Sequence, residues 1–379
     1  MSRAWSEIDL GAVRSNVAAL RRLTGRGVIA VVKANAYGHG AVAVGRAALE
    51  ASARMLAVAT VEEAVELSSA GLGPVLILGA LIEEEILAAL AAKASVTVHS
   101  VEEVVRLGRV ARSLDLEARV HVEVDVGLAR HGAAPSEALS VVEAALATPG
   151  VALEGLMCHL ARAGDREAAH EALARFEPVV RAVRARARGI LVHAAASTAA
   201  LTLEEARFDL VRPGIALHGI DEGLSHGALR PTLALKAKVV RTREIEAGTP
   251  VGYGATWTAR RKTKLAVVGL GYDDGLPYRL SNRGRLLLQG ASCPIVGTVM
   301  MDFVVCDVTD APPVQAGDVA TAIGTDGRES ISVDEVARTA GVIPYVVTCG
   351  LGRRSRRVYL GEQIAALTST ARLRRARSG

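Results

Sequence analysis

The sequence is poor in aromatic residues and cysteines, and it has no long apolar run. Phe, Trp and Tyr make up 3% of the 379 residues. The four cysteines are scattered without C-x-x-C spacing, so they indicate neither a metal site nor a disulfide framework, and we expect buried, reduced thiols. No run reaches the length of a membrane span, and the opening M-S-R-A-W-S-E-I-D-L has no apolar signal region. We therefore expect a cytoplasmic protein that does not contact a membrane.

Basic charge is concentrated at the carboxyl terminus. The net charge is +5, but the last nine residues, A-R-L-R-R-A-R-S-G, contain four arginines and no acid, and without them the net charge is +1. No aromatic residue interleaves with this run, and no other basic run is long enough to follow a phosphate backbone. We expect residues 366–379 to form a disordered, solvated tail and predict no nucleic-acid partner.

Apolar, β-rich runs alternate with alanine-rich amphipathic runs in the first part of the chain. The expected strands are residues 28–32, 56–59, 75–78, 96–99, 119–124, 153–159, 190–193 and 208–211. Eight strands, each followed by a helix, predict the α/β class and a (β/α)8 TIM-type barrel over residues 1–228. No G-x-G-x-x-G opens the first helix, so a dinucleotide-binding fold has little support.

The pattern changes near Leu229. Short alternating runs divided by Gly, Pro and Asp are typical of antiparallel strands. We predict a second, mostly β domain over residues 229–365, with one short helix at 332–339.

A lysine stands at the end of the first apolar run, in V-I-A-V-V-K-A-N-A-Y-G-H-G. One interpretation is a lysine whose amine reaches water beyond the strand. The other is an amine kept neutral by reaction with a carbonyl, because a lone buried ammonium is unfavourable. Ala34, Asn35 and Gly38 leave room beside Lys33, and Tyr37 follows it where a phosphorylated carbonyl cofactor could sit.

The run V-V-K-A-N-A-Y-G-H-G resembles the pyridoxal-phosphate signature of alanine racemases, which are α/β-barrel enzymes, and later motifs extend the resemblance along nearly the whole chain. The resemblance implies that Lys33 carries pyridoxal 5′-phosphate and also serves as one of two catalytic bases. It places Tyr37 among the residues that bind the cofactor.

The motif H-V-E-V-D-V-G-L-A-R-H-G resembles the family's H-x-K-x-D-T-G-M-x-R-x-G. Arg130 would then reach the phenolic oxygen of the cofactor and the substrate carboxylate, two anions that suit a planar guanidinium. Glu123 stands where many members have a carbamylated lysine that orients the arginine. Our hypothesis is that this permanent carboxylate keeps the same role. We assign no role to His99, which stands at the end of an earlier strand.

Three further motifs imply contacts to the cofactor. His159, in E-G-L-M-C-H-L-A, matches a histidine that lies against the pyridine ring. Ser197, in H-A-A-A-S-T-A-A, is expected to cap a helix and offer its hydroxyl to the phosphate. Gly214 and Ile215, in V-R-P-G-I-A-L-H-G, would add backbone donors. A phosphate held after the seventh and eighth strands is the usual barrel arrangement.

Arg212 opens the last of these motifs, at a position where the family has an arginine. An arginine only donates hydrogen bonds, so it leaves the ring nitrogen of the cofactor unprotonated. The resulting electron sink is weak, which favours removal and return of an α-proton over transamination. The alternative is an arginine in a structural ion pair.

The predicted β domain carries the remaining matches. T-P-V-G-Y-G-A-T-W-T resembles the segment that supplies the second base, here Tyr253, because racemisation needs proton donors on both faces. Tyr272 matches a residue of the entrance. Met301 would offer its backbone N–H to the substrate carboxylate, with Asp302 holding the loop. Arg353 occupies a position where a tyrosine often binds phosphate.

The resemblance implies interconversion of L- and D-alanine, which supplies D-alanine for cell-wall peptidoglycan. In the family the tyrosine comes from the neighbouring subunit, so a head-to-tail homodimer with two shared sites is implied. A racemase of the same mechanism acting on serine, lysine or arginine is the nearer alternative. Four departures around the site favour it: Cys158, Ala196, Thr298 and Arg353.

A non-catalytic cofactor-binding protein on the same barrel is the more distant alternative. Such proteins lack the second domain, so Tyr253 and Met301 argue against it. A decarboxylase of related fold is disfavoured by Arg212, because loss of carbon dioxide profits from a protonated ring.

Overall fold

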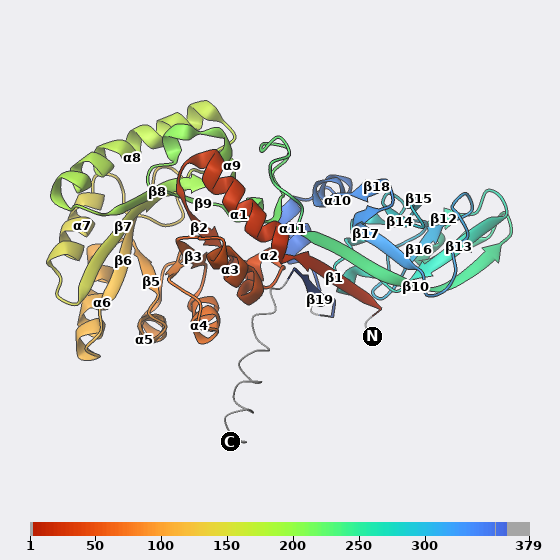
Figure 1. Cartoon of the computed structure of the whole chain (residues 1–379), viewed down its shortest axis with the longest axis horizontal. Helices are drawn as coiled ribbons and strands as arrows, with labels where there is room; N and C mark the ends of the chain where they lie inside the picture. Colours follow the sequence, from red (N-terminus) through yellow and green to blue (C-terminus); the bar gives the residue numbers. More distant parts are fainter. Residues whose placement is uncertain (1–2, 353, 362–379) are drawn as a thin grey trace, which may run out of the picture.

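Eight parallel strands close into a barrel in chain order, which confirms the predicted fold class (Figure 1). The computed structural model describes residues 3–352 and 354–361, so Arg353, residues 362–365 of the predicted β domain and the predicted tail at 366–379 lie outside the described residues. The barrel strands are β2 (Gly27–Val31), β3 (Met55–Val58), β4 (Val75–Ile77), β5 (Ser95–Val98), β6 (Ala118–Val124), β7 (Val151–Cys158), β8 (Leu191–Ala196) and β9 (Leu210–Arg212). Pairing of β2 with β9 completes the ring.

The barrel strands are mostly apolar because both of their faces are buried, although β5 to β8 also carry polar residues such as His121 and His193. Helices cover the outside of the ring, and polar caps start several of them: Thr60 and Glu63 form a capping box, and Ser100 and Asp165 cap the helices that follow them. The helices are α1 (Leu10–Thr24), α2 (Lys33–Tyr37), α3 (Ala41–Glu50), α4 (Val61–Ser69), α5 (Ile86–Ala91), α6 (Val101–Ser113), α7 (Ala138–Ala147), α8 (Arg166–Arg186) and α9 (Ser197–Thr202).

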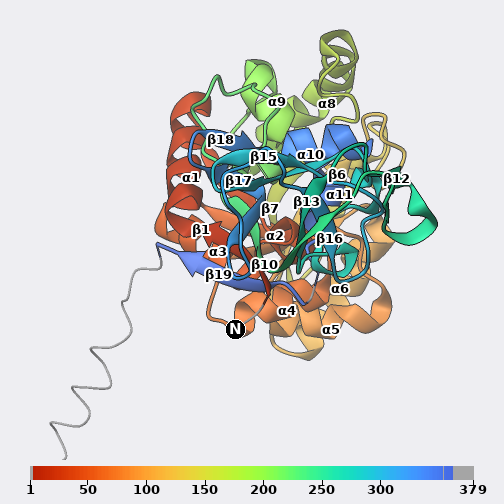
Figure 2. The same ribbon diagram turned by 90° about the vertical axis from the view of Figure 1, so that its right-hand side faces the viewer.

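A second domain, mostly β, lies beside the barrel, as predicted. Its main sheet has the order β15-β14-β17-β10-β1-β19, with β13, β16 and β18 attached, and β11 and β12 form a separate hairpin. The strands are β10 (Leu233–Ile245), β11 (Pro250–Val251), β12 (Trp257–Thr258), β13 (Thr263–Val268), β14 (Arg285–Leu288), β15 (Ala291–Pro294), β16 (Val304–Asp307), β17 (Val319–Asp326), β18 (Glu329–Ile331) and β19 (Arg356–Leu360). Figure 2 looks along the molecule with this domain in front of the barrel.

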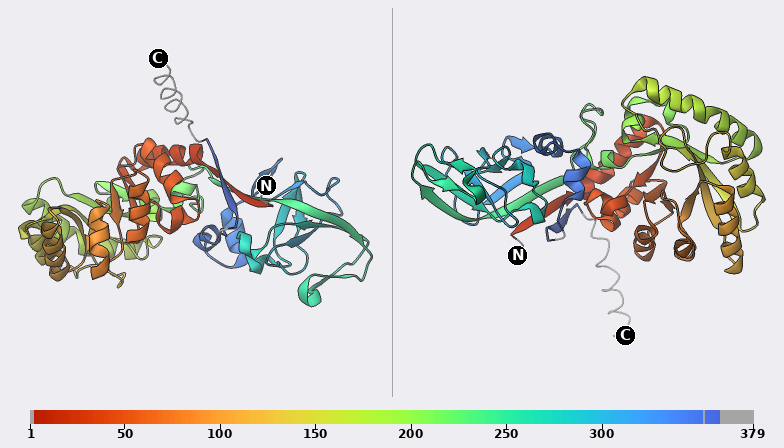
Figure 3. Two further views of the ribbon diagram at one scale, coloured as in Figure 1. Left: turned by 90° about the horizontal axis from the view of Figure 1, so that it is seen from below. Right: turned by 180° about the vertical axis from the view of Figure 1, so that it is seen from behind.

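The first strand of the chain, β1 (Ala4–Asp9), belongs to this second sheet. It pairs antiparallel with β10 and parallel with β19, although it falls within the predicted barrel range of 1–228. Its side chains alternate between buried and half-buried, the pattern of a strand with two unequal faces rather than a barrel strand. Figure 3 shows β1 and the long β10 crossing between the two domains.

Two α-helices, rather than the single one predicted, lie between β18 and β19 of the β domain. α10 (Val333–Ala340) matches the prediction, and α11 (Pro344–Cys349) begins with proline at its first turn. α11 lies directly against the loop after β2, where a Cβ on Gly38 would be 2.1 Å from the carbonyl oxygen of Thr348. This close approach brings the β domain to the mouth of the barrel.

The four cysteines are unpaired, and the expectation that all are buried was wrong for Cys349, which is exposed at the end of α11. No helix among the described residues combines the length and hydrophobicity needed to cross a membrane.

Candidate active site

A cavity of about 340 Å³ opens at the carboxyl ends of the barrel strands. Eight of the predicted site residues line it: Lys33, Tyr37, Arg130, His159, Ser197, Arg212, Gly214 and Ile215. They come from segments spread over more than half of the barrel sequence. Tyr345 of α11, which the sequence did not single out, lines the cavity from the β domain.

Cavity size alone does not identify this site. A cavity of about 390 Å³ lies on the outside of the barrel against α1, α3 and β19, lined in part by Arg14, Arg46 and Glu50. It contains none of the predicted site residues. The chemistry of the smaller cavity, at the strand ends where barrel sites form, makes it the candidate.

Lys33 begins an unusual turn rather than ending a strand. β2 stops at Val31, and the residues from Ala34 to Tyr37 all have positive φ, between 51° and 55°, which makes α2 a left-handed turn. Such a conformation is costly without glycine and needs outside support. Glu63 of α4 provides it by accepting hydrogen bonds from the backbone N–H of Ala34 (2.5 Å) and of Ala59 (2.8 Å).

The environment of the Lys33 amine favours its neutral form. Burial lowers the pKa of Lys33, and the charge of Arg130 lowers it further, although Glu63 opposes the shift. A neutral amine is the nucleophile required to react with a carbonyl.

Ser197, Gly214 and Tyr37 meet at one end of the cavity. The Ser197 hydroxyl oxygen accepts hydrogen bonds from the backbone N–H of Gly214 (3.0 Å) and of Ala216 (3.3 Å). The prediction that Ser197 caps a helix was wrong, since it is the first residue of α9, after Ala196. A Cβ on Gly214 would lie 2.2 Å from the Tyr37 hydroxyl, so only glycine fits there.

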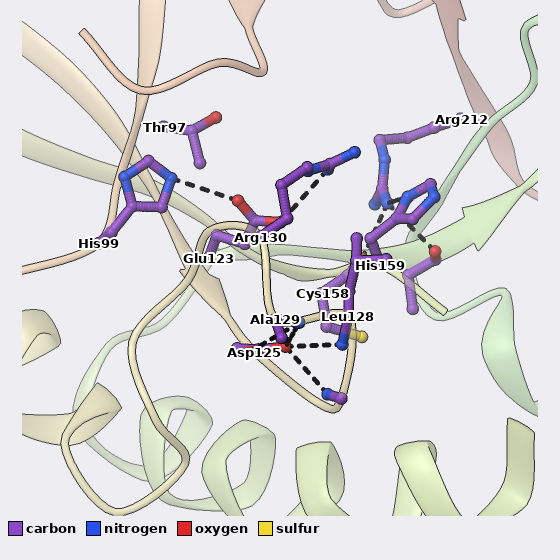
Figure 4. Close-up of polar contacts among 12 residues, drawn as sticks. Thr97, His99, Glu123, Asp125, Leu128, Ala129, Arg130, Cys158, His159 and Arg212 are labelled. Atoms are coloured by element: carbon purple, nitrogen blue, oxygen red, sulfur yellow. Dashed lines mark hydrogen bonds and ion pairs between the residues drawn. The ribbon is translucent and has the colours of Figure 1, made fainter. Parts of the chain in front are cut away.

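Arg212 is buried in the wall of the cavity, next to His159. It donates to the carbonyl oxygens of Cys158 (2.8 Å) and His193 (2.7 Å), and its Nη2 lies 3.4 Å from Nδ1 of His159 (Figure 4). Burial lowers the pKa of His159 to about 4, with the charges of Arg212 and Arg130 acting in the same direction. His159 is therefore neutral at physiological pH and can pack against an aromatic ring.

Arg130 approaches Glu123 from a loop after β6. Its Nη2 lies 4.0 Å from Oε1 of Glu123, a buried carboxylate, as Figure 4 shows. Asp125 holds the loop by accepting hydrogen bonds from the backbone N–H of Gly127, Leu128 and Ala129. The sequence reasoning missed Asp125, although an aspartate two residues before a glycine is a turn signal.

His99, to which the sequence reasoning gave no role, contacts the same carboxylate. Its Nε2 lies 3.2 Å from Oε2 of Glu123, and its Nδ1 lies 3.1 Å from Oε2 of Glu103. The spacing of four residues between His99 and Glu103 was the available signal. The contact of His99 with Glu123 links the end of β5 to β6, and nothing in the local sequence predicts it.

The predicted residues of the β domain that the structure describes lie outside this cavity. Tyr253 is 73% exposed, and Tyr272 and Met301 are also exposed. The Thr298 hydroxyl donates to the carbonyl oxygen of Tyr253 at 2.9 Å. Asp302 accepts a hydrogen bond from Nη1 of Arg354 at 2.7 Å, which ties its loop to the segment before β19.

Comparison with known proteins gives a consistent result over both domains. Residues 8–222 match the family model "Alanine racemase, N-terminal domain", and residues 232–359 match "Alanine racemase, C-terminal domain". An alanine racemase of Symbiobacterium thermophilum is 39% identical over 370 residues, covering 96% of this chain and 98% of the relative. One of Syntrophobacter fumaroxidans is 37% identical over 361 residues, covering 93% and 96%.

Solved structures agree. The crystal structure of alanine racemase from D-cycloserine-producing Streptomyces lavendulae has a TM-score of 0.90 and 35% identity, covering 96% of this chain and 98% of that one. A Bartonella henselae alanine racemase with covalently bound pyridoxal phosphate has a TM-score of 0.84 and 28% identity, covering 95% and 100%. On these matches and on the fold of both domains, the chain belongs to the alanine racemase family.

Proposed function

We propose that this chain is a pyridoxal-phosphate-dependent racemase that interconverts L- and D-alanine with Lys33 and Tyr253 as its two bases. The observation that carries the proposal is the cavity itself. It brings together a lysine of lowered pKa and a buried arginine, at the strand ends of a barrel whose relatives are alanine racemases.

The residues present fit the cofactor. Ser197, Gly214 and Ile215 offer a hydroxyl and backbone groups for a phosphate, and Arg212 and His159 suit a pyridine ring. The absence of a side chain at Gly214 leaves room for the Tyr37 phenol beside them. Burial raises the pKa of Tyr37, which keeps its hydroxyl as a donor. When bound, pyridoxal phosphate accepts electron density from the α-carbon of the substrate.

The side chains of this chain would perform the remaining steps. Lys33 would hold the cofactor through Nζ and move the α-proton on one face. Arg130, oriented by Glu123, would bind the substrate carboxylate, with the Met301 backbone N–H as a second donor. Arg212 would donate to the ring nitrogen and keep it unprotonated, which would limit side reactions.

Tyr253 has to reach the opposite face from a second copy of the chain. It is exposed and lies outside the barrel cavity of its own chain, as do Met301 and Tyr272. We infer a head-to-tail homodimer in which each copy completes the site of the other, with Asp302 holding the donated loop and Tyr272 near the entrance. We also propose a cytoplasmic location and supply of D-alanine for peptidoglycan. The role proposed from sequence for Arg353 in phosphate binding stays a prediction.

Racemisation of a larger amino acid by the same residues is the second candidate. Ala196 lines the cavity, and its small side chain leaves space at a position where the family usually has asparagine.

The direct test is incubation of the protein and pyridoxal phosphate with L-alanine, L-serine, L-lysine and L-arginine in deuterated water, following chirality and α-deuterium. We expect D-alanine to dominate and to vanish in Lys33→Ala. A different D-isomer would favour the second candidate. Absence of deuterium uptake from every substrate would contradict racemase activity.

A further inference from the structure

A row of polar side chains runs through the barrel interior, away from the cavity, starting at Arg212. Its Nη1 lies 2.7 Å from Nδ1 of His193. Nε2 of His193 lies 2.8 Å from Nδ1 of His121, and Nε2 of His121 lies 3.2 Å from Oε2 of Glu154. The hydroxyl of Ser95, the first residue of β5, donates to the same oxygen. Four barrel strands other than that of Arg212 thus contribute to one chain of hydrogen bonds.

The two ends of the row fix the direction of every hydrogen bond. Arginine can only donate, so Nδ1 of His193 must accept and its proton must lie on Nε2. That proton is donated to Nδ1 of His121, whose own proton therefore lies on Nε2 and is donated to Glu154. A carboxylate can only accept, so the order closes without conflict.

The charge states agree with this order. Burial lowers the pKa of His193 well below its ordinary value, and the charge of Arg212 adds to the shift, so the imidazole is neutral. The hydrogen bond from His121 lowers the pKa of Glu154 despite its partial burial, so the carboxylate is ionised. The row therefore joins a buried cation to an anion through two imidazoles.

The backbone is shaped for the row at both histidines. Val120 of β6 pairs with Leu153 of β7, but His121 pairs with Gly155, so Glu154 is an extra residue in a β-bulge. A bulge re-aims a side chain that alternation would point elsewhere. A second irregularity between β8 and β9 begins at His193.

Gly155 itself leaves room for the imidazole of His121. A Cβ at this position would lie 2.2 Å from Nδ1 of His121. Any side chain there would displace the ring from the contact with His193. The absence of a side chain is a second feature, independent of the bulge, that accommodates the row.

Within the described residues, no carboxylate forms an ion pair with Arg212 directly. Its other hydrogen bonds go to the backbone carbonyl oxygens of Cys158, His193 and Ala194 and to the ring of His159. If the acceptor at the far end were lost, His121 and His193 could adopt their other tautomers. A proton on Nδ1 of His193 would then face an N–H group of Arg212, and two donors repel each other.

We propose that Glu154 is a positioning residue for Arg212, which acts through His121 and His193 to hold the guanidinium in one orientation. The inference rests on the role proposed above for Arg212 at the ring nitrogen. Glu154 does not contact the cavity, so its effect on the reaction passes through the row alone.

The first test observes the histidines directly. The holoenzyme, labelled with 15N in its histidine rings, is compared with Glu154→Ala and Glu154→Gln by NMR. We expect His193 and His121 to carry their protons on Nε2 in the parent protein and to show mixed tautomers in Glu154→Ala. Glutamine can donate or accept, so Glu154→Gln should show a weaker change in the same direction. Glu117→Gln is the matched control, because this exposed glutamate immediately precedes β6.

The second test measures what happens when Arg212 moves. A guanidinium that no longer holds the ring nitrogen unprotonated permits transamination, in which the amino group of alanine passes to the aldehyde carbon of the cofactor and pyruvate is released. We expect the ratio of pyruvate formed to alanine racemised to rise about tenfold in Glu154→Ala, as loss of a buried partner predicts. Glu117→Gln should keep the parent ratio.

Unchanged tautomers and an unchanged ratio in both Glu154 variants would overturn the proposal. If Glu154→Ala does not fold, the nearly isosteric Glu154→Gln decides by the same two measurements. If the parent protein had no racemase activity, that result would contradict the proposed function instead. The NMR comparison would still decide whether Glu154 orders the row.

Discussion

Nε2 of His99 lies 3.2 Å from Oε2 of Glu123, and this contact makes His99 part of the support of Arg130. The other ring nitrogen faces Glu103, and the ring of His131 lies 5.3 Å away between centroids. Although burial opposes it, hydrogen bonds to Glu103 and Glu123 raise the pKa of His99 to about 9. His99 is therefore an imidazolium with a carboxylate at each nitrogen.

The raised pKa of His99 predicts a pH-dependent contribution to stability. A group whose pKa is higher in the folded state stabilises fully below its unfolded pKa, about 6.5, and loses that contribution as pH rises through about 9. The difference in unfolding free energy between the parent protein and His99→Gln should fall by about 3 kcal/mol over this interval. Urea unfolding at fixed protein and cofactor concentrations measures it. The exposed His226→Asn is the control, and a pH-independent difference would contradict the assignment.

Glu123→Gln should reduce the kcat/KM for L-alanine by about tenfold, mainly through KM, because a charged partner of Arg130 is lost. Steady-state kinetics with the cofactor saturating test this. Glu102→Gln, at an exposed position of α6, should behave as the parent protein does. Full activity of Glu123→Gln would exclude the carboxylate as the group that orients Arg130.

Shared active sites predict complementation between two inactive chains. Lys33→Ala removes one base and Tyr253→Phe removes the other, so each pure dimer should lack racemase activity. A mixed dimer has one site with both residues intact, and random mixing should restore about a quarter of the parent activity. Co-expression of the two chains, with each alone as a control, provides the measurement. No recovery in dimers shown to be mixed would place both bases on the same chain.

Thr298→Val should lower kcat several-fold without changing cofactor affinity. The Thr298 hydroxyl donates to the carbonyl oxygen of Tyr253, and valine keeps the shape but removes that hydrogen bond. Racemisation rates and cofactor titration by absorbance separate the two effects. Thr325→Val, exposed on β17, is the matched substitution. A loss of cofactor affinity equal to the loss of rate would indicate a general distortion instead.

Much of the fold could be predicted from local pattern, because the parallel barrel strands are mostly apolar and helical runs alternate with them. The place of β1 in the second sheet could not be predicted in this way, because its partners, β10 and β19, lie more than 200 residues away in the chain. The left-handed turn after Lys33 was also missed, since Ala34 and Ala36 have no intrinsic preference for positive φ. The bond from Glu63, a residue of another helix, supports it.

By itself, the sequence determined where most of the barrel strands end, because their apolar runs stop at polar residues such as Lys33 and His159. Together with the resemblance to the family, it indicated Lys33, Arg130, His159 and Arg212 as neighbours before any contact was known. Only the tertiary structure decided what surrounds them. The contact of His99 with Glu123 and the row from Arg212 to Glu154 depend on strand register and a single bulge, and a shift of one residue in register would turn these side chains away from one another.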